Sequence, residues 1–160
     1  MATKPSIHKA SEAHDPWVCL LRGHAVVRRT VATQLQDLHG LTVNEYEALL
    51  LLSRAEGKCM RRIDLADALE LSASGVTRLL EGLERQGMVE KAVCPTDGRV
   101  TYAVLTQAGS RMLAKASGAH LAALRTVFEE RYTRTELATL AELLARLSGP
   151  AGGAQNGRFA

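Results

Sequence analysis

The segment Arg62–Gly109 constrains the fold of this 160-residue chain more than any other part of the sequence. Its apolar residues follow helical spacing from Ile63 to Leu69, which predicts a short helix. Ser72 then supplies a side-chain oxygen for an N-cap, and the apolar pattern that follows it stops at Gly87. The sequence therefore predicts two helices joined by a tight turn.

A two-stranded ribbon is predicted directly after these helices. Residues 89–94 and 100–105 are rich in β-branched side chains, and Pro95-Thr96-Asp97-Gly98 between them favour a turn. A short strand at Cys59-Met60 could precede the first of the two helices. Helix, turn, helix and ribbon in this order are typical of a winged helix-turn-helix, so we expect a mainly α fold with a small β-wing (α+β).

Long amphipathic helices are predicted on both sides of this region. The first has an apolar stripe over Trp17–Leu38, with Pro16 in its first turn and Gly40 after its end. Thr42-Val43-Asn44-Glu45 matches a capping box, in which the hydroxyl and the carboxylate each bind a free backbone N–H. This box predicts a second helix that ends near Gly57.

Two further helices are predicted after the ribbon. Thr106 starts a long helix that we expect to reach about Tyr132, and Thr133-Arg134-Thr135-Glu136 is a second capping box. In the last helix we expect four leucines to point inward: Leu137, Leu140, Leu144 and Leu147. The outer helices have more apolar surface than a thin winged domain can cover, which predicts pairing with a second copy of the chain.

These patterns predict one structural domain with helical extensions. Its parts are a flexible N-terminus (1–14), an N-terminal dimerisation helix (15–40), a winged helix-turn-helix region (41–109), C-terminal dimerisation helices (110–148) and a disordered tail (149–160).

The composition argues against several classes of protein. The longest apolar run, Ala48–Leu52, is far too short to span a membrane, and the first residues lack a hydrophobic signal region. We therefore expect a cytoplasmic protein with no membrane partner. The sequence shows no nucleophile–base pair, Gly-rich phosphate loop or carboxylate cluster, so we expect neither an enzyme nor a cofactor.

The charge of the chain neither demands nor excludes nucleic-acid binding. The net charge is only +3, and residues 61–111 contain seven Arg or Lys against seven Asp or Glu. Affinity for DNA would therefore depend on where the charges point.

The polar face of the helix after Ser72 is the first candidate DNA-contact surface. Helical spacing places Val76, Leu79, Leu80 and Leu83 on its buried face. It places Ser74, Arg78, Glu81 and Arg85 outward, with Thr77 on the flank. Arg78 could form two parallel hydrogen bonds to a guanine edge, and Ser72 could bind a phosphate. The alternative is an ordinary amphipathic helix with a solvated polar face.

Further cations surround this helix in the sequence. Arg99 lies at the tip of the ribbon, where it could enter a minor groove, and Asp97 could hold its guanidinium in place. Arg61, Arg62 and Lys91 are placed to contact phosphates. The combination favours double-stranded DNA as a partner more than any of its parts does.

A series of short motifs extends over about residues 17–147. They are Leu41-Thr42, Glu45-Tyr46, Asp64-Leu65-Ala66, Leu69, Leu71-Ser72, Val76-Thr77-Arg78-Leu79, Leu83-Glu84-Arg85-Gln86-Gly87-Met88-Val89, Asp97-Gly98-Arg99 and Leu105-Thr106-Gln107-Ala108-Gly109. Together they resemble the MarR family of multiple-antibiotic-resistance type regulators. The family's wing motif is Asp-x-Arg, which Asp97 and Arg99 match, whereas Gly98 stands where the family often has Arg.

The resemblance implies a triangular homodimer with one winged domain in each lobe. In such a dimer the first and last helices of the two chains intertwine. Two-fold symmetry would place the two reading helices about one DNA turn, roughly 34 Å, apart and would require a near-palindromic site. The resemblance further implies regulation of transcription, with repression as the usual outcome.

The resemblance also implies that a small phenolic or lipophilic anion could bind between the dimer helices and the winged lobe and release DNA. Candidate pocket residues are Trp17, His24, Arg28 and Tyr46. The alternative for His24, which falls on the apolar stripe, is a core or interface histidine. For Trp17, Tyr46 and Tyr132 the alternative is packing.

Regulation by oxidants or metals is a further possibility within the same fold. Cys19 lies where the family's organic-hydroperoxide sensors have a reactive cysteine, but the tyrosines that activate it are absent, so we expect a small buried apolar residue. Oxidation of Cys94 on the wing would perturb Arg99. No zinc-site spacing exists among the histidines, and the helix after the wing contains only His120, so we expect no metal site. A winged helix used purely for protein contacts is the remaining alternative.

Overall fold

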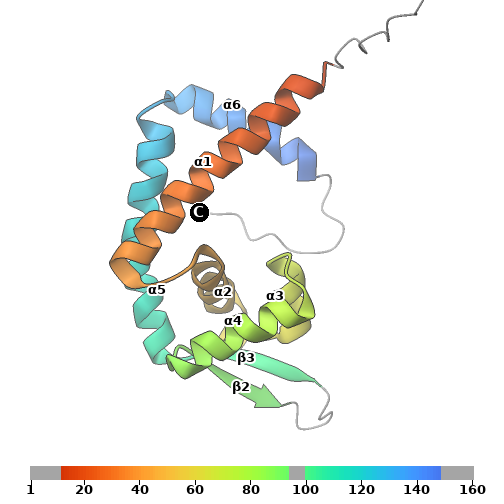
Figure 1. The fold of residues 1–160 in the computed structure, drawn as a ribbon, viewed down its shortest axis with the longest axis vertical. Coiled ribbons are helices and arrows are strands. Elements are labelled where there is room, and N and C mark those ends of the chain that lie inside the picture. The colour runs from red at the N-terminus through yellow and green to blue at the C-terminus, as the bar shows by residue number, and fades with distance from the viewer. Residues whose placement is uncertain (1–11, 94–99, 149–160) are drawn as a thin grey trace, which may run out of the picture.

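The fold is mainly helical, with a small antiparallel sheet, as the sequence predicts. The structure is a computed structural model that describes residues 12–93 and 100–148 (Figure 1). Its elements are α1 (His14–His39), α2 (Val43–Arg54), the 3-10 turn η1 (Glu56–Lys58), β1 (Cys59–Arg61), α3 (Arg62–Ala68), α4 (Ala73–Arg85), β2 (Val89–Val93), β3 (Thr101–Leu105), α5 (Gln107–Leu124), the π-helical turn η2 (Arg125–Glu129), α6 (Arg134–Ala145) and the 3-10 turn η3 (Arg146–Ser148).

The predicted capping residues begin the helices. Thr42 and Glu45 form a reciprocal capping box, in which the Thr42 N–H donates to Glu45 Oε2 at 2.8 Å and the Glu45 N–H donates to Thr42 Oγ1 at 3.2 Å. Thr133 and Glu136 form the same arrangement at the start of α6, and the hydrogen bonds from Thr133 lower the pKa of the Glu136 carboxyl. At the other end of α1, Gly40 takes a left-handed conformation with φ of 65°.

The sheet has the strand order β1-β3-β2 and is antiparallel throughout. Its two long strands form the predicted ribbon, in which Lys91 pairs with Ala103, and the short strand predicted at Cys59-Met60 is confirmed as β1. The ribbon's tip, including the candidate residues Asp97 and Arg99, lies outside the described residues.

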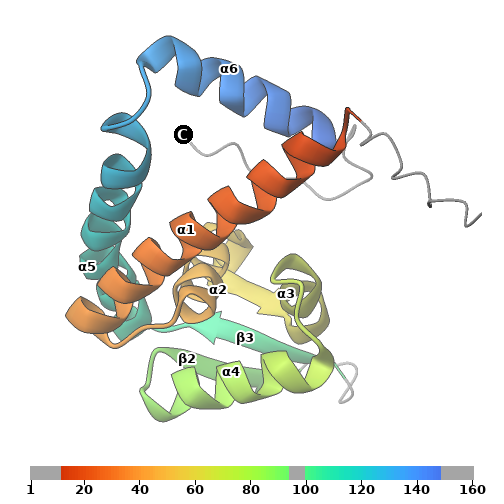
Figure 2. The same ribbon diagram turned by 45° about the horizontal axis from the view of Figure 1, so that its top comes forward.

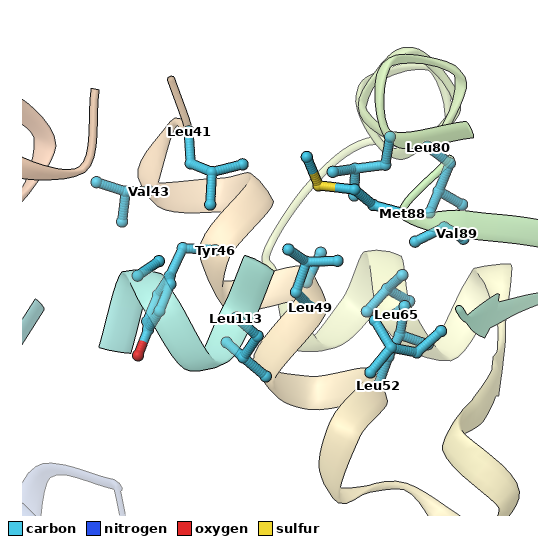
Figure 3. Packing of buried hydrophobic residues seen from close by; sticks show 14 of the residues in the cluster. Leu41, Val43, Tyr46, Leu49, Leu52, Leu65, Leu80, Met88, Val89 and Leu113 are labelled. Atoms are coloured by element: carbon cyan, nitrogen blue, oxygen red, sulfur yellow. The ribbon is translucent and has the colours of Figure 1, made fainter. Parts of the chain in front are cut away.

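A single apolar core joins the sheet to the helices that cover it. Leu49 and Leu52 of α2 lie near Leu65 of α3 and Leu113 of α5, and all four are buried (Figure 3). Leu80 of α4 closes the core from the opposite side. Helix α2 therefore links α3, α4 and the sheet to the longer helices.

Helices α1, α5 and α6 form an open frame above this core (Figures 1 and 2). Helix α1 packs along α5, but α6 has no buried residue in the single chain. The prediction that all four leucines of α6 point inward is wrong for the single chain, since Leu144 is exposed and Leu147 is 71% exposed. The spacing identified an apolar stripe, but the described part of the chain covers it only in part: Leu137 and Leu140 are half-buried. No helix among residues 12–93 and 100–148 is both long and apolar enough to cross a bilayer.

The long helix predicted to run unbroken to about Tyr132 is interrupted. Helix α5 ends at Leu124 and continues as the π-helical turn η2. The Arg131 guanidinium donates to the carbonyls of Thr126 and Val127, and so satisfies acceptors at this helix end. Residue spacing gave no indication of the wider turn.

Gly109 lies where α5 passes closest to the start of β2. A Cβ atom at this position would overlap the carbonyl oxygen of Met88 and lie 2.7 Å from Leu105 Cδ1. We expect Gly109→Ala to lower the free energy of unfolding by about 1–3 kcal/mol, the usual cost of overpacking. Chemical denaturation would measure the change.

Gly118, further along α5, provides the matched control because a Cβ atom there meets nothing within 4 Å. Gly118→Ala should raise stability by roughly 0.5–1 kcal/mol through the higher helix propensity of alanine. Equal effects of the two substitutions would contradict the close approach at Gly109.

Candidate nucleic-acid interface

Helix α4 presents the predicted polar face to solvent. Val76, Leu80 and Leu83 are buried against the core, which fixes the rotation of the helix about its axis. Leu79, which we also expected to be buried, is only half-buried because it borders a cavity. The predicted outward residues are exposed: Ser74, Arg78, Glu81 and Arg85. An exposed cation thus lies one turn from the start of a helix whose opposite face is firmly packed.

Two serine hydroxyls form hydrogen bonds at the first turn of α4. Ser72 Oγ accepts the backbone N–H of Gly75 at 3.1 Å, which confirms Ser72 as the N-cap. Ser74 Oγ lies 3.1 Å from Ser72 Oγ and shares a hydrogen bond with it. Both residues are exposed, so this turn remains accessible to a ligand.

Arg61 and Arg62 are adjacent in sequence but are held by different partners. Arg61 donates from Nε and Nη2 to the two carboxylate oxygens of Asp64, at 2.7 and 2.8 Å. This pairing raises the pKa of the guanidinium. Arg62 instead donates from Nη2 to Thr77 Oγ1 of α4 at 2.7 Å. Sequence spacing gave no sign of the second contact, because it joins two helices.

Three of the candidate DNA-contact residues lie around one cavity. Arg61, Arg62 and Thr77 line a cavity of about 570 Å³ between α3, α4 and the start of β3. Lys91 is exposed on β2, the strand that leads toward the tip of the ribbon. Whether any of these groups contacts DNA stays a prediction at this point.

The four candidate ligand-pocket residues do not share one cavity. Trp17 is 58% exposed and His24 is exposed, whereas Tyr46 is only 3% exposed. Arg28 donates to Asn44 Oδ1 at 2.8 Å and so ties α1 to α2. His24 is not a core residue of the single chain, since its side chain is exposed beside two cavities, and the alternative of an interface histidine stays a prediction.

Tyr46 belongs to the core instead. Its ring stacks on His120 of α5, with ring centroids 4.6 Å apart and planes 29° apart, and its hydroxyl lies 3.4 Å from Ser117 Oγ. Burial lowers the pKa of His120, and its Nδ1 is buried without a hydrogen-bond partner in the described part of the chain. Packing, the alternative weighed for Tyr46, describes its position in this chain.

Two of the cavities that border α1 contain His24. One of about 730 Å³ lies between α1, η2 and α6, is mainly apolar, and is lined by Cys19, His24, Phe128 and Tyr132 among others. The expectation of a buried Cys19 is therefore wrong: the residue is exposed beside this cavity. As with α6, the apolar spacing did not distinguish a core from an uncovered surface.

The second cavity, of about 530 Å³, lies between α1, α2 and the α3–α4 connection, and contains His24, Arg28 and Glu47. Burial raises the pKa of Glu47, and the charges of Arg28 and His24 partly oppose that shift. Sequence analysis missed Glu47, although its place between apolar residues of α2 was a usable indication. The described residues contain no group of three or more His, Cys, Asp and Glu that could hold a metal ion.

The pKa of His120 predicts a dependence of stability on pH. Burial lowers this pKa in the folded chain, so the unfolded chain takes up the proton first as the pH falls below about 6.5. Above that pH both states are neutral at this residue and its contribution is complete. Below it, the free energy of unfolding decreases until the folded pKa is passed.

His120→Phe keeps a ring against Tyr46 and removes this titration. We expect the variant to lose less stability than the wild type between about pH 7 and pH 5, as measured by urea denaturation at each pH. Parallel profiles for His120→Phe and the wild type would contradict the argument.

The chain is similar to known proteins over both its winged region and its whole fold. A family model described as the MarR family matches residues 39–100. The uncharacterised HTH-type transcriptional regulator YdgJ of Bacillus subtilis (strain 168) is 30% identical over 83 residues, which cover 52% of this chain and 49% of that protein. The chain thus spans about half the length of this curated relative.

Two solved structures extend the likeness to the outer helices. CouR from Rhodococcus jostii RHA1, bound to p-coumaroyl-CoA, has a TM-score of 0.71 and 27% identity, covering 86% of this chain and 94% of that one. Sco3205, a MarR family transcriptional regulator from Streptomyces coelicolor in complex with DNA, has a TM-score of 0.78 and 24% identity, covering 86% and 90%. At the latter identity the likeness concerns the fold alone.

Proposed function

This chain belongs to the MarR family, and we propose that it is a sequence-specific DNA-binding regulator of transcription that acts as a homodimer. The observation that carries the proposal is the placement of α4. Its apolar face is packed into the core, while Ser74 and Arg78 are exposed on the opposite face, beside the ribbon. This is the arrangement that a helix needs in order to enter a major groove.

Each candidate residue has a proposed role. Arg78 would read a guanine edge, and the first turn of α4, with Ser72 and Ser74, would approach the DNA backbone or base edges. Arg61 and Lys91 would contact phosphates, and the same role was predicted for Arg62. Arg99 would enter the minor groove from the ribbon tip, oriented by Asp97, as the family resemblance implies.

The homodimer is proposed from the uncovered apolar surface of the frame. Trp17 and Leu21 of α1, Leu143 of α6 and Leu147 of η3 are largely exposed in the single chain. Apolar side chains so close together indicate a surface that another protein covers. We propose that residues 15–40 and 110–148 form the dimer, that residues 41–109 bind DNA, and that residues 1–14 and 149–160 lie outside both parts.

Regulation would follow from the same geometry. Two α4 helices related by a two-fold axis would bind a near-palindromic operator, and occupation of that site would repress transcription. A small aromatic or lipophilic ligand would release the DNA; CouR, at 27% identity, provides a ligand-bound relative. The cavities beside α1 are the proposed places for it.

Two arginine substitutions test DNA binding. Genomic fragments retained by the wild-type protein would first define its preferred site. Arg78→Ala should then relax the preference at one base position, at a cost of about 1–3 kcal/mol there. Arg99→Ala should weaken binding to all sequences and lower the salt slope by about one unit. Both are measurable by fluorescence anisotropy across salt concentrations.

Glu81→Gln, on the same exposed face of α4, is the control, because it removes a negative charge and leaves every cation in place. It should not lower the salt slope. Enrichment of no fragment by the wild type, or unchanged binding by both arginine variants, would favour a winged helix used for protein contacts.

Leu144 of α6 and Leu147 of the following turn η3 provide a test of the dimer. Leu144→Glu combined with Leu147→Glu places charges on the uncovered apolar stripe, so we expect the dimer to dissociate and operator binding to fall at least tenfold. Sedimentation velocity and anisotropy would measure the two effects. Ala138→Glu adds the same charge to the other side of α6 and should preserve the dimer. A wild-type chain that sediments as a monomer yet binds its operator tightly would contradict the proposal.

A further inference from the structure

The hydroxyl group of Thr77 is engaged on two sides. The O–H group of Thr77 donates to the carbonyl oxygen of Ala73, one turn earlier in α4, at an O···O distance of 2.7 Å. The Thr77 oxygen itself accepts a hydrogen bond from Arg62 Nη2 of α3, also at 2.7 Å. The contact between Arg62 and Thr77 is part-buried and spans 15 residues of sequence. It therefore joins two helices rather than two neighbours on one helix.

We propose that Arg62 is a positioning residue for α4, which acts through Thr77 rather than chiefly through a phosphate. The proposal rests on the proposed function, since it concerns how α4 meets DNA. It differs from the role predicted for Arg62 on sequence grounds, which was a phosphate contact alone.

A directional bond matters here because most of the other side chains that line the cavity between α3 and α4 are apolar, Asp67 being an exception. Ala66 and Val76 are buried at this cavity, whereas Ile63, at the start of α3, is 64% exposed and adds little. Apolar contacts resist separation of two helices but have no preferred direction. The hydrogen bond from a charged guanidinium supplies that direction, and it fixes the part of α4 from which Ser74 and Arg78 extend.

The two bonds also determine what Thr77 can offer to DNA. A hydroxyl has one hydrogen to donate and two lone pairs to accept with. The hydrogen is used by Ala73 and one lone pair by Arg62, so Thr77 cannot donate to a phosphate or to the acceptor atoms of guanine. It retains one lone pair and a methyl group, which suit the amino group of adenine or cytosine, or the methyl group of thymine.

Among the described residues, only one N–H group of the Arg62 side chain has a hydrogen-bond partner. A guanidinium has five N–H groups, and the contact with Thr77 uses one of them. If a phosphate were bound by the other N–H groups, the Arg62 side chain would link that phosphate directly to the orientation of α4. Arg61 differs, because both of its bonds go to Asp64 within its own segment.

A set of matched variants tests this role in the full-length chain. Arg62→Ala and Thr77→Val each remove the contact, Thr77→Ser keeps the hydroxyl, and Arg62→Ala with Thr77→Val completes a double-mutant cycle. Arg61→Ala is the control, since it removes a neighbouring cation whose hydrogen bonds go to Asp64 rather than to α4. Binding to the wild-type protein's selected DNA site is measured by anisotropy at several salt concentrations, and thermal unfolding confirms that each variant folds.

For a positioning role we expect Thr77→Val to weaken binding about tenfold with an unchanged salt slope, since it removes no charge. Arg62→Ala should cost at least as much, the double variant should be no weaker than Arg62→Ala, and Thr77→Ser should restore binding. Arg61→Ala should lower the salt slope by about one unit and add fully to Thr77→Val. Additive effects of Arg62→Ala and Thr77→Val, or a Thr77→Val variant that binds like the wild type, would overturn the proposal.

A measurement without DNA separates this proposal from the proposed function. Amide hydrogen exchange in the first two turns of α4 should become at least threefold faster in both Arg62→Ala and Thr77→Val, but not in Arg61→Ala or Thr77→Ser. Unchanged exchange in Arg62→Ala would overturn the positioning role even if the chain binds DNA. Faster exchange with no DNA selected by the wild type would leave the contact established and reject the proposed function.

Discussion

Burial of the leucines of α2 is the interaction on which the other parts of the molecule depend. Leu49 and Leu52 have no exposed surface, and they contact elements on both sides of α2. Each such side chain contributes on the order of 1.5–3 kcal/mol when it is fully buried. Helix α2 is thus the common support of the α1–α5 frame and of the winged region, and the capping box at Thr42 determines where that support begins.

The positions of the charges show how residues 61–111, whose formal charges cancel, can still be suited to binding a polyanion such as DNA. Arg61 is paired with Asp64, and Arg62 is directed at α4, so neither is simply a free surface cation. Arg78, by contrast, extends from an exposed face that the core holds in a fixed rotation. Affinity from a few directed groups favours discrimination between sequences over general attraction to phosphate. The equal numbers of acidic and basic residues in residues 61–111 are consistent with binding that depends on a few directed cations.

Local chemistry predicted much of the fold, whereas contacts between distant segments were not predictable. Thr42, Ser72 and Thr133 identified helix starts because a cap depends only on the next three residues. The stripe on α6 and the environment of Cys19 were misjudged, because spacing shows that a face is apolar without showing what covers it. The contact between Arg62 and Thr77 has no periodic pattern, since it depends on the packing of two helices.

The junction at Gly109 has a consequence for how movement passes through the molecule. The Met88 carbonyl accepts the N–H of Thr106, and the Thr106 hydroxyl donates to the carbonyl of Gly87. The connection between α4 and β2, at Gly87 and Met88, and the first turn of α5 therefore meet at one tightly packed joint. Such a joint has no room to act as a hinge. A tilt of α5 would turn α4 and the ribbon together as one rigid unit. In the proposed homodimer, the distance between the two units, rather than the shape of either, is then the quantity that can vary.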